Sequence, residues 1–253
     1  MIRKLSTTLA IIGTVTLLGS APASEAADLR VLASNGVKAA VEALKPQLEK
    51  ASGEKLSIAF NTAATQRERI EKGEVFDIAV LTDDAMEALA KEGKVSSMLT
   101  KLARVGIGVG YRKGAPKPDV RTADSIKQTL LNAKAIAYTA NGASRPGIDR
   151  MFERLGIAKQ LQSKSKLTAA GAAPASVGKG ESDLVLTLIS EILPEPGVEL
   201  AGPLPVEFQS YIGFSAAASP KATSSPAVAA FIKFLNSPAA AATYKEKGME
   251  ATR

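Results

Sequence analysis

Short apolar stretches alternate with amphipathic ones along most of the chain. The first three apolar stretches have the length and composition of buried strands: they are LRVLAS (29–34), KLSIAFN (55–61) and VFDIAVLT (75–82). Each is followed by a helical pattern, and these patterns end at Gly53, Gly73 and Gly93, where a left-handed residue would close a helix. Strands that alternate with helices predict an α/β fold with helices on the faces of a mainly parallel sheet.

Two later stretches show strict alternation. In RVGIGVGYR (104–112) apolar residues alternate with three glycines, so one face of the strand is apolar and the other allows close packing. The second, YIGFSAAA (211–218), follows a further series of strand and helix patterns, and a helical stretch at 225–248 comes after it. We therefore expect the chain to leave one lobe, build another and return. The predicted lobes are 27–107 with 209–253, and 108–208, each a mainly parallel sheet flanked by helices, with two crossover strands as the hinge.

The first 26 residues have the pattern of a cleavable signal peptide. Arg3 and Lys4 precede an uncharged run that ends at Ser24, and small residues lie near Ala26, after which we expect cleavage. The chain holds no cysteine, which excludes disulfides and a lipid-modified cysteine at the cleavage site. We therefore expect a periplasmic protein that is not lipid-anchored and has no stable membrane insertion after cleavage.

The amino-acid composition limits the kinds of catalysis, metal binding and partner that the chain can have. The chain has no histidine and no cysteine, which excludes Ser-His-Asp and Cys-His catalysis and the commonest ligands of transition metals, so we expect no metal and no cofactor. Without residues 1–26, which hold two basic residues and one acidic residue, the net charge falls from +7 to +6. A positive field attracts anions, but the basic residues are scattered and not interleaved with aromatic ones, so nucleic acid is not expected as a partner.

Four loops of small or polar residues are expected to surround the cleft between the lobes. They are ASNG (33–36), NTAAT (61–65), NGASRPG (141–147) and AAPAS (172–176). The N–H groups at the start of a helix are unpaired and carry partial positive charge, so loops that lead into helices hold anions well. The candidate ligand-binding residues on or near these loops and the following strand are Ser34, Asn35, Gly36, Asn61, Thr62, Ala63, Ser144, Arg145 and Thr187.

Three further stretches give the chain a family resemblance. They are RIEKGEVFDIAVLTDDAMEALAKEGKV (69–95), RPGIDRMFERLG (145–156) and FLNSPAAAATYKEKG (234–248), and with them the chain resembles the periplasmic molybdate-binding proteins of ABC importers. The resemblance implies a type II periplasmic binding fold, a permease and an ATPase in the inner membrane as partners, and a tetrahedral oxyanion held by serine hydroxyls, backbone N–H groups and a tyrosine. The family's two serines fall on Gly36 and Ala63, its alanine on Pro146, and its tyrosine near Thr187.

Because of these departures from the family's residues, the sequence is compatible with more than one class of ligand. Hydroxyl groups are lost or moved, and Arg145 is added. An arginine suits a carboxylate or phosphate, because a guanidinium can bind two oxygens at once. The function expected is therefore an ABC-importer receptor for a molybdate-like oxyanion or, alternatively, for a small organic acid. Each candidate also has a simpler explanation: Ser34, Asn35 and Thr62 suit helix caps, Thr187 a strand core, and Arg145 a solvated surface. An enzyme would have to work with carboxylates and is not expected; an envelope adaptor or sensor could share the fold.

Overall fold

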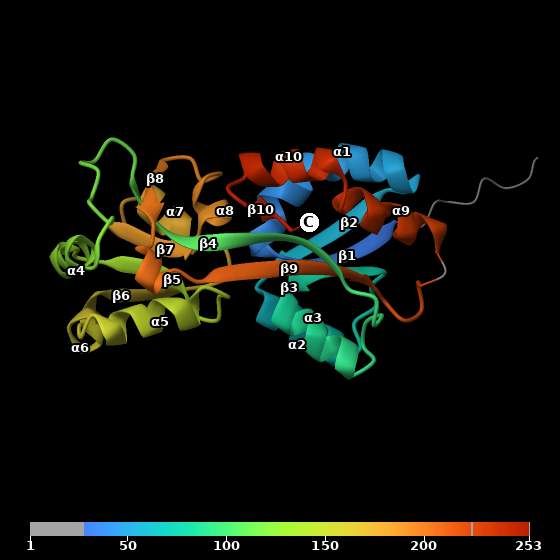
Figure 1. Ribbon diagram of the computed structural model, residues 1–253, viewed down its shortest axis with the longest axis horizontal. Helices are drawn as coiled ribbons and strands as arrows, with labels where there is room; N and C mark the ends of the chain where they lie inside the picture. The colour runs from blue at the N-terminus through green and yellow to red at the C-terminus, as the bar shows by residue number, and fades with distance from the viewer. Residues whose placement is uncertain (1–27, 224, 253) are drawn as a thin grey trace, which may run out of the picture.

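The chain folds into two lobes that lie side by side and are joined by two long strands (Figure 1). The computed structural model describes residues 28–223 and 225–252. The connecting strands are β4 (Thr100–Arg112) and β9 (Tyr211–Ala218). They run antiparallel and pair with each other as far as Gly106 and Tyr211, where the two lobes meet. The sequence pattern of two crossover strands is confirmed.

Lobe 1 contains a mixed sheet. Its strand order is β2-β1-β3-β9-β4, and β10 pairs with the outer edge of β4. The first three strands run parallel, and the pairs made by β9 and β10 are antiparallel, because one crossover strand leaves the lobe and the other returns. The strands not yet given are β1 (Leu29–Ser34), β2 (Leu56–Asn61), β3 (Ile78–Thr82) and β10 (Glu250–Ala251).

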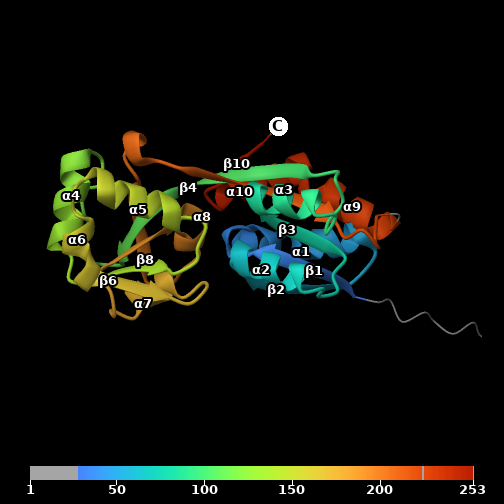
Figure 2. The same ribbon diagram turned by 90° about the horizontal axis from the view of Figure 1, so that it is seen from below.

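Helices cover both faces of this sheet (Figures 1 and 2). One face packs against α1 (Lys38–Ser52), α9 (Pro226–Leu235) and α10 (Pro238–Glu246). The other face packs against α2 (Ala63–Glu71) and α3 (Asp83–Lys91), whose buried side chains include Ile70, Met86 and Leu89. Each face therefore has its own apolar core.

Lobe 2 repeats this plan. The second half of β4 pairs with β7 on one side and β8 on the other, and β7, β5 and β6 follow in parallel. The strands are β5 (Ile136–Thr139), β6 (Ser165–Thr168), β7 (Leu184–Leu188) and β8 (Val198–Pro203). The helices are α4 (Ala123–Asn132), α5 (Arg145–Arg154), α6 (Ala158–Leu161), α7 (Ala173–Gly178) and α8 (Ile189–Ile192). Short 3-10 turns lie at Asn35–Val37 (η1), Gln162–Lys164 (η2) and Val206–Phe208 (η3).

The glycines of β4 permit the close packing that their alternation predicts. A β-carbon on Gly108 would lie 2.8 Å from Ile189 Cγ1 of α8, and one on Gly110 would lie 2.6 Å from Val185 Cγ1 of β7. Both distances are shorter than carbon atoms tolerate in contact. The glycine face of β4 thus allows α8 of lobe 2 to pack close to the junction with lobe 1.

The predicted helical stretch near the C-terminus is divided in the structure. The helical pattern at 225–248 is two helices, because Pro238 lacks an N–H group and starts α10 after the break at Asn236 and Ser237. The predicted signal peptide, 1–26, lies outside the described residues. Within the part of the chain that the structure describes, no helix has the length and apolarity needed to cross a membrane.

Candidate functional site

The ends of β1 and β2 bring the first predicted residues to the edge of lobe 1 that faces lobe 2. Ser34 ends β1 and is buried, and its hydroxyl accepts a hydrogen bond from the Gly36 N–H group at 3.4 Å. Gly36 is buried as well: a β-carbon there would lie 2.5 Å from Phe214 Cζ and 2.7 Å from Leu188 Cδ1. Glycine is therefore required for packing at this position. Asn35, between them, lines a hollow between the lobes.

The next loop starts helix α2. The side chain of Thr62 caps this helix by accepting from the Thr65 N–H group at 3.2 Å, and Asn61 Oδ1 accepts from the Thr62 N–H group at 2.8 Å. The N–H groups of Ala63 and Ala64 open the helix and have no partner within it. Thr62 thus has the capping role that its position predicts, while α2 presents its N-terminus at the cleft.

The loop before α5 in lobe 2 contacts the start of α2 in lobe 1. Asn141 Nδ2 donates to Thr65 Oγ1 at 3.3 Å, which joins the two lobes directly. Ser144 is the first residue before α5 and is buried, with no side-chain hydrogen bond to the helix. A second bond between the lobes lies on α8, where Ser190 Oγ donates to the Gly36 carbonyl at 2.7 Å.

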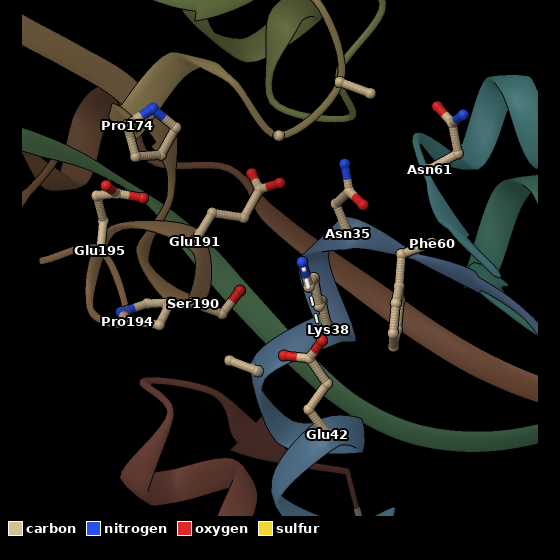
Figure 3. Close-up of a pocket in the computed structure, with 13 residues that line it drawn as sticks. Asn35, Lys38, Glu42, Phe60, Asn61, Pro174, Ser190, Glu191, Pro194 and Glu195 are labelled. Atoms are coloured by element: carbon tan, nitrogen blue, oxygen red, sulfur yellow. Dashed lines mark ion pairs between the residues drawn. The ribbon is translucent and has the colours of Figure 1, made fainter. Parts of the chain in front are cut away.

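Between these contacts lies a hollow of about 470 Å³ (Figure 3). Its lobe 1 wall comes from η1, α1 and β2. Its lobe 2 wall comes from α7 and the loop before it, and from α8 and the residues that follow it. Both polar and apolar residues line it. The lining residues are Asn35, Lys38, Ala39, Glu42, Phe60, Asn61, Ala170, Gly171, Pro174, Ser190, Glu191, Pro194 and Glu195.

The cation of this hollow, Lys38, is held loosely. Lys38 Nζ lies 3.8 Å from Glu42 Oε1 and 5.8 Å from the centre of the Phe60 ring. The side chains of Lys38 and Glu42 are each about half exposed, at 52% and 54%. Exposed pairs one helical turn apart contribute little, so the ammonium group can turn toward a bound anion at small cost.

Glu191 projects into the same hollow toward Asn35 (Figure 3). Its carboxylate accepts a hydrogen bond from the Thr187 hydroxyl. Burial of the carboxyl raises the pKa of Glu191 above its ordinary value of 4.5, although the bonds from Thr187 and from the Leu188 N–H group act in the opposite direction. Thr187 itself is buried in β7, so it reaches the hollow only through Glu191.

A second hollow of about 560 Å³ lies on the other side of the contact between Asn141 and Thr65. It is lined by the starts of α2 and α3, by the loop before α5 and by β9. Ala63 belongs to this hollow, as do Asp83 and Asp84. Asp83 is held in place by Ser215, whose hydroxyl donates to its carboxylate at 2.5 Å.

The structure does not bring Arg145 to either hollow. Its guanidinium lies 2.7 Å from Asp149 and 4.9 Å from the centre of the Tyr138 ring, in a separate surface depression on lobe 2. Asp149 is one helical turn further along α5, and this pairing turns the arginine along the helix. The expectation that Arg145 faces the cleft loops is corrected accordingly.

The predicted residues therefore divide into those that line a hollow, those that are buried behind the surface, and Arg145, which lies in the separate depression. Asn35 and Asn61 line the first hollow, and Ala63 lines the second. Ser34, Gly36, Thr62, Ser144 and Thr187 are buried behind the surface. Lys38 and Glu191 were not among the predicted residues, and Asn141 was predicted only as part of the cleft loop 141–147. A signal existed for Glu191, because it is a single acidic residue in the apolar stretch LTLISEIL (186–193).

Comparison with known proteins identifies the family. A family model described as bacterial extracellular solute-binding protein matches residues 29–250. The chain belongs to this family. A bacterial extracellular solute-binding protein of this kind is expected outside the cytoplasm, in agreement with the location predicted from the N-terminal residues.

One curated relative of this solute-binding protein carries an enzyme's name. It is aconitate isomerase from Pseudomonas sp., which is 31% identical over 248 residues, covering 92% of this chain and 93% of the relative. The chain is therefore similar to a protein named as an isomerase and also belongs to a family of solute-binding proteins.

Solved structures confirm the fold. The periplasmic molybdate-binding protein of Azotobacter vinelandii matches with a TM-score of 0.74 at 17% identity, covering 89% of this chain and all of the other. PEB3 of Campylobacter jejuni, with L-phospholactate bound, matches with a TM-score of 0.67 at 19% identity, covering 88% and 99%. The solute-binding protein thus has the type II periplasmic binding fold, and its resemblance to molybdate-binding proteins is confirmed.

Proposed function

We propose that the protein is a solute receptor that binds a small organic polyacid in the hollow lined by Asn35 and Glu191. The mixed lining of this hollow carries the proposal. The amides of Asn35 and Asn61 stand beside apolar walls that include Phe60 and Pro174 (Figure 3). An organic acid matches both kinds of surface, because it has carboxylates and a carbon skeleton. A tetrahedral oxyanion has only oxygen atoms to offer and matches the polar part alone.

The size of the hollow supports the same ligand class. A volume of about 470 Å³ falls within the range of about 300–1,000 Å³ that is typical of sites for organic ligands. The ammonium group of Lys38 supplies positive potential at its lobe 1 wall. Aconitate and L-phospholactate, named with two of the similar proteins, are both small organic acids.

Closure of the lobes would complete the site. Asn141 and Thr65 already connect the lobes beside the hollow, and β4 and β9 are the two strands about which they can turn. A ligand that contacts both walls favours the closed arrangement, which an ABC permease and its ATPase would recognise in the inner membrane.

Calorimetric titration tests the ligand class. Tricarballylate, citrate and trans-aconitate are titrated against molybdate, tungstate and sulfate. We expect the carboxylates to bind more tightly, and Asn35→Ala to weaken their binding about tenfold, because one hydrogen bond to a charged group is lost. Asn132→Ala, the same change at the exposed end of α4, is the matched control. Tighter binding of molybdate than of every carboxylate would contradict the proposal.

A second function, turnover of the bound acid, is favoured by Glu191 and by the isomerase relative. Above the pKa of Glu191 in the complex, its ionised carboxylate could remove a proton from the carbon next to the double bond of a bound unsaturated acid. The electron pair of the broken C–H bond would form a new double bond to the neighbouring carbon. The electrons of the former double bond would move to its far carbon, which would take up a proton, so the reaction involves no net oxidation. Proton NMR of trans-aconitate in D₂O tests this, since turnover produces the cis isomer with deuterium incorporated. Binding without any isomer or deuterium would leave the receptor role alone.

A further inference from the structure

The hollow proposed for an anion contains a carboxylate that no cation neutralises. Among the described residues, no lysine or arginine lies within ion-pair distance of Glu191. Its hydrogen-bond donors are the Thr187 hydroxyl and the Leu188 N–H group, both neutral. The other charged groups that face the hollow are Lys38 and Glu42 of α1 and Glu195 after α8; Lys38 is weakly paired with Glu42 and forms no ion pair with Glu191.

An incoming polyanion adds negative charge to this space. Two negative groups within about 4–6 Å disfavour each other's ionised forms, and the weaker acid of the two takes up a proton. The carboxylates of the ligand are ordinary solvent-exposed acids before binding, whereas burial already raises the pKa of Glu191. Glu191 is therefore the group that protonates first.

Protonation also changes what Glu191 can do. An ionised carboxylate only accepts hydrogen bonds, but a protonated one donates one. Its carboxyl points toward Asn35 across the hollow and would meet a ligand held there (Figure 3). A repulsive contact would thus become a hydrogen bond of the strong, charge-assisted kind.

We propose that Glu191 takes up one proton when a polyanion binds in this hollow, and that its protonated carboxyl donates a hydrogen bond to the ligand. The inference rests on the proposed function, since it needs an anion in the hollow. Thr187 acts as a positioning residue, because its hydroxyl fixes one side of the carboxyl and leaves the other toward the ligand. Binding then weakens as pH rises, by up to about tenfold per pH unit above the pKa of Glu191 in the free protein.

Proton uptake can be measured directly. Calorimetric titration with trans-aconitate is repeated in buffers of different ionisation enthalpy, from about pH 5 to about pH 9, and the dependence of heat on buffer gives the number of protons bound. We expect uptake of about one proton between the pKa of Glu191 in the free protein and its higher pKa in the complex. Glu191→Gln, which donates without titrating, should take up none and bind with little dependence on pH. Glu87→Gln, on the exposed face of α3, is the matched control and should behave as the parent does.

The outcomes separate this inference from the proposed function. Equal proton uptake by the parent and Glu191→Gln overturns the inference while carboxylate binding stands. If trans-aconitate gives no heat, sulfate and molybdate are titrated in the same way. Proton uptake that disappears in Glu191→Gln with those anions sustains the inference while the organic-acid assignment fails. Absence of binding by every anion overturns both.

Discussion

The side-chain amide of Gln209 binds both backbone groups of Ile107. Gln209 Oε1 accepts from the Ile107 N–H group at 2.8 Å, and Nε2 donates to the Ile107 carbonyl at 3.0 Å. Ile107 is the residue of β4 at which pairing passes from lobe 1 to lobe 2, and Gln209 lies two residues before the returning strand β9. The same side chain covers Gly106, where a β-carbon would lie 3.2 Å from it. One glutamine thus ties the two crossover strands together at the hinge.

Gln209→Glu should destabilise the protein. The new carboxylate still accepts from the Ile107 N–H group, but it cannot donate to the carbonyl and places negative charge beside it. We expect a loss of about 1–3 kcal/mol and a melting temperature lower by several degrees, measured by circular dichroism. Gln128→Glu on the exposed face of α4 is the control. An unchanged melting temperature would show that the hinge does not depend on this contact.

Arg145→Ala should leave ligand affinity within about twofold of the parent. The guanidinium is engaged with Asp149 and the Tyr138 ring, away from both hollows. Loss of these partly exposed contacts should cost about 0.5–1 kcal/mol of stability. Calorimetry with trans-aconitate and thermal denaturation measure the two effects separately. A tenfold loss of affinity would show that Arg145 contributes to ligand binding.

Glu191→Gln should stabilise the ligand-free protein at neutral pH but not in acid. The pKa of Glu191 is raised in the folded state, so ionisation opposes folding. The penalty is absent below the ordinary value of 4.5, grows as pH rises toward the folded pKa, and is constant above it. The gain is about 1.4 kcal/mol for each unit by which the pKa is raised. Melting curves of the parent and of Glu191→Gln across this pH range test the prediction. A stability difference that is the same at all pH values would contradict it.

Tyr244→Phe should cost about 1–2 kcal/mol of stability. The Tyr244 hydroxyl is buried and donates to the Leu235 carbonyl at 2.8 Å, which ties α10 to the end of α9. Burial also raises the pKa of this hydroxyl, so it remains a donor at neutral pH. Removing it leaves a buried carbonyl without that donor. Chemical denaturation measures the loss, and Tyr211→Phe, at a half-exposed tyrosine, should be nearly neutral.

The sequence predicted the strands and helix ends of lobe 1 because their signals are local. Gly53, Gly73 and Gly93 follow helices with φ angles of 76°, 88° and 66°, the left-handed conformation that glycine accepts most readily. The alternation of apolar residues and glycine in β4 likewise indicated a strand packed closely on one face. The break before Pro238 was also present in the sequence, as a proline inside a helical pattern.

The site was predicted less well because side-chain direction depends on tertiary contacts. Asn35 follows β1 and Asn61 ends the parallel strand β2, and these positions alone bring them to the cleft. Arg145 has an equally suggestive position, yet its direction depends on Asp149 and on Tyr138 from the neighbouring strand. Glu191 became important only when α8 placed it opposite Asn35.

The position of β9 between β3 and β4 has a consequence for the order in which the chain folds. Lobe 2 is built from one continuous segment, so it can fold as soon as that segment has been synthesised. Lobe 1 cannot, because the strand that fills the middle of its sheet is Tyr211–Ala218, far along the chain from its neighbours. Until that strand arrives, the edges of β3 and β4 remain unpaired and able to pair with other chains. Nascent lobe 1 is therefore the part that most needs a chaperone, and the distant strand pairing should set the folding rate.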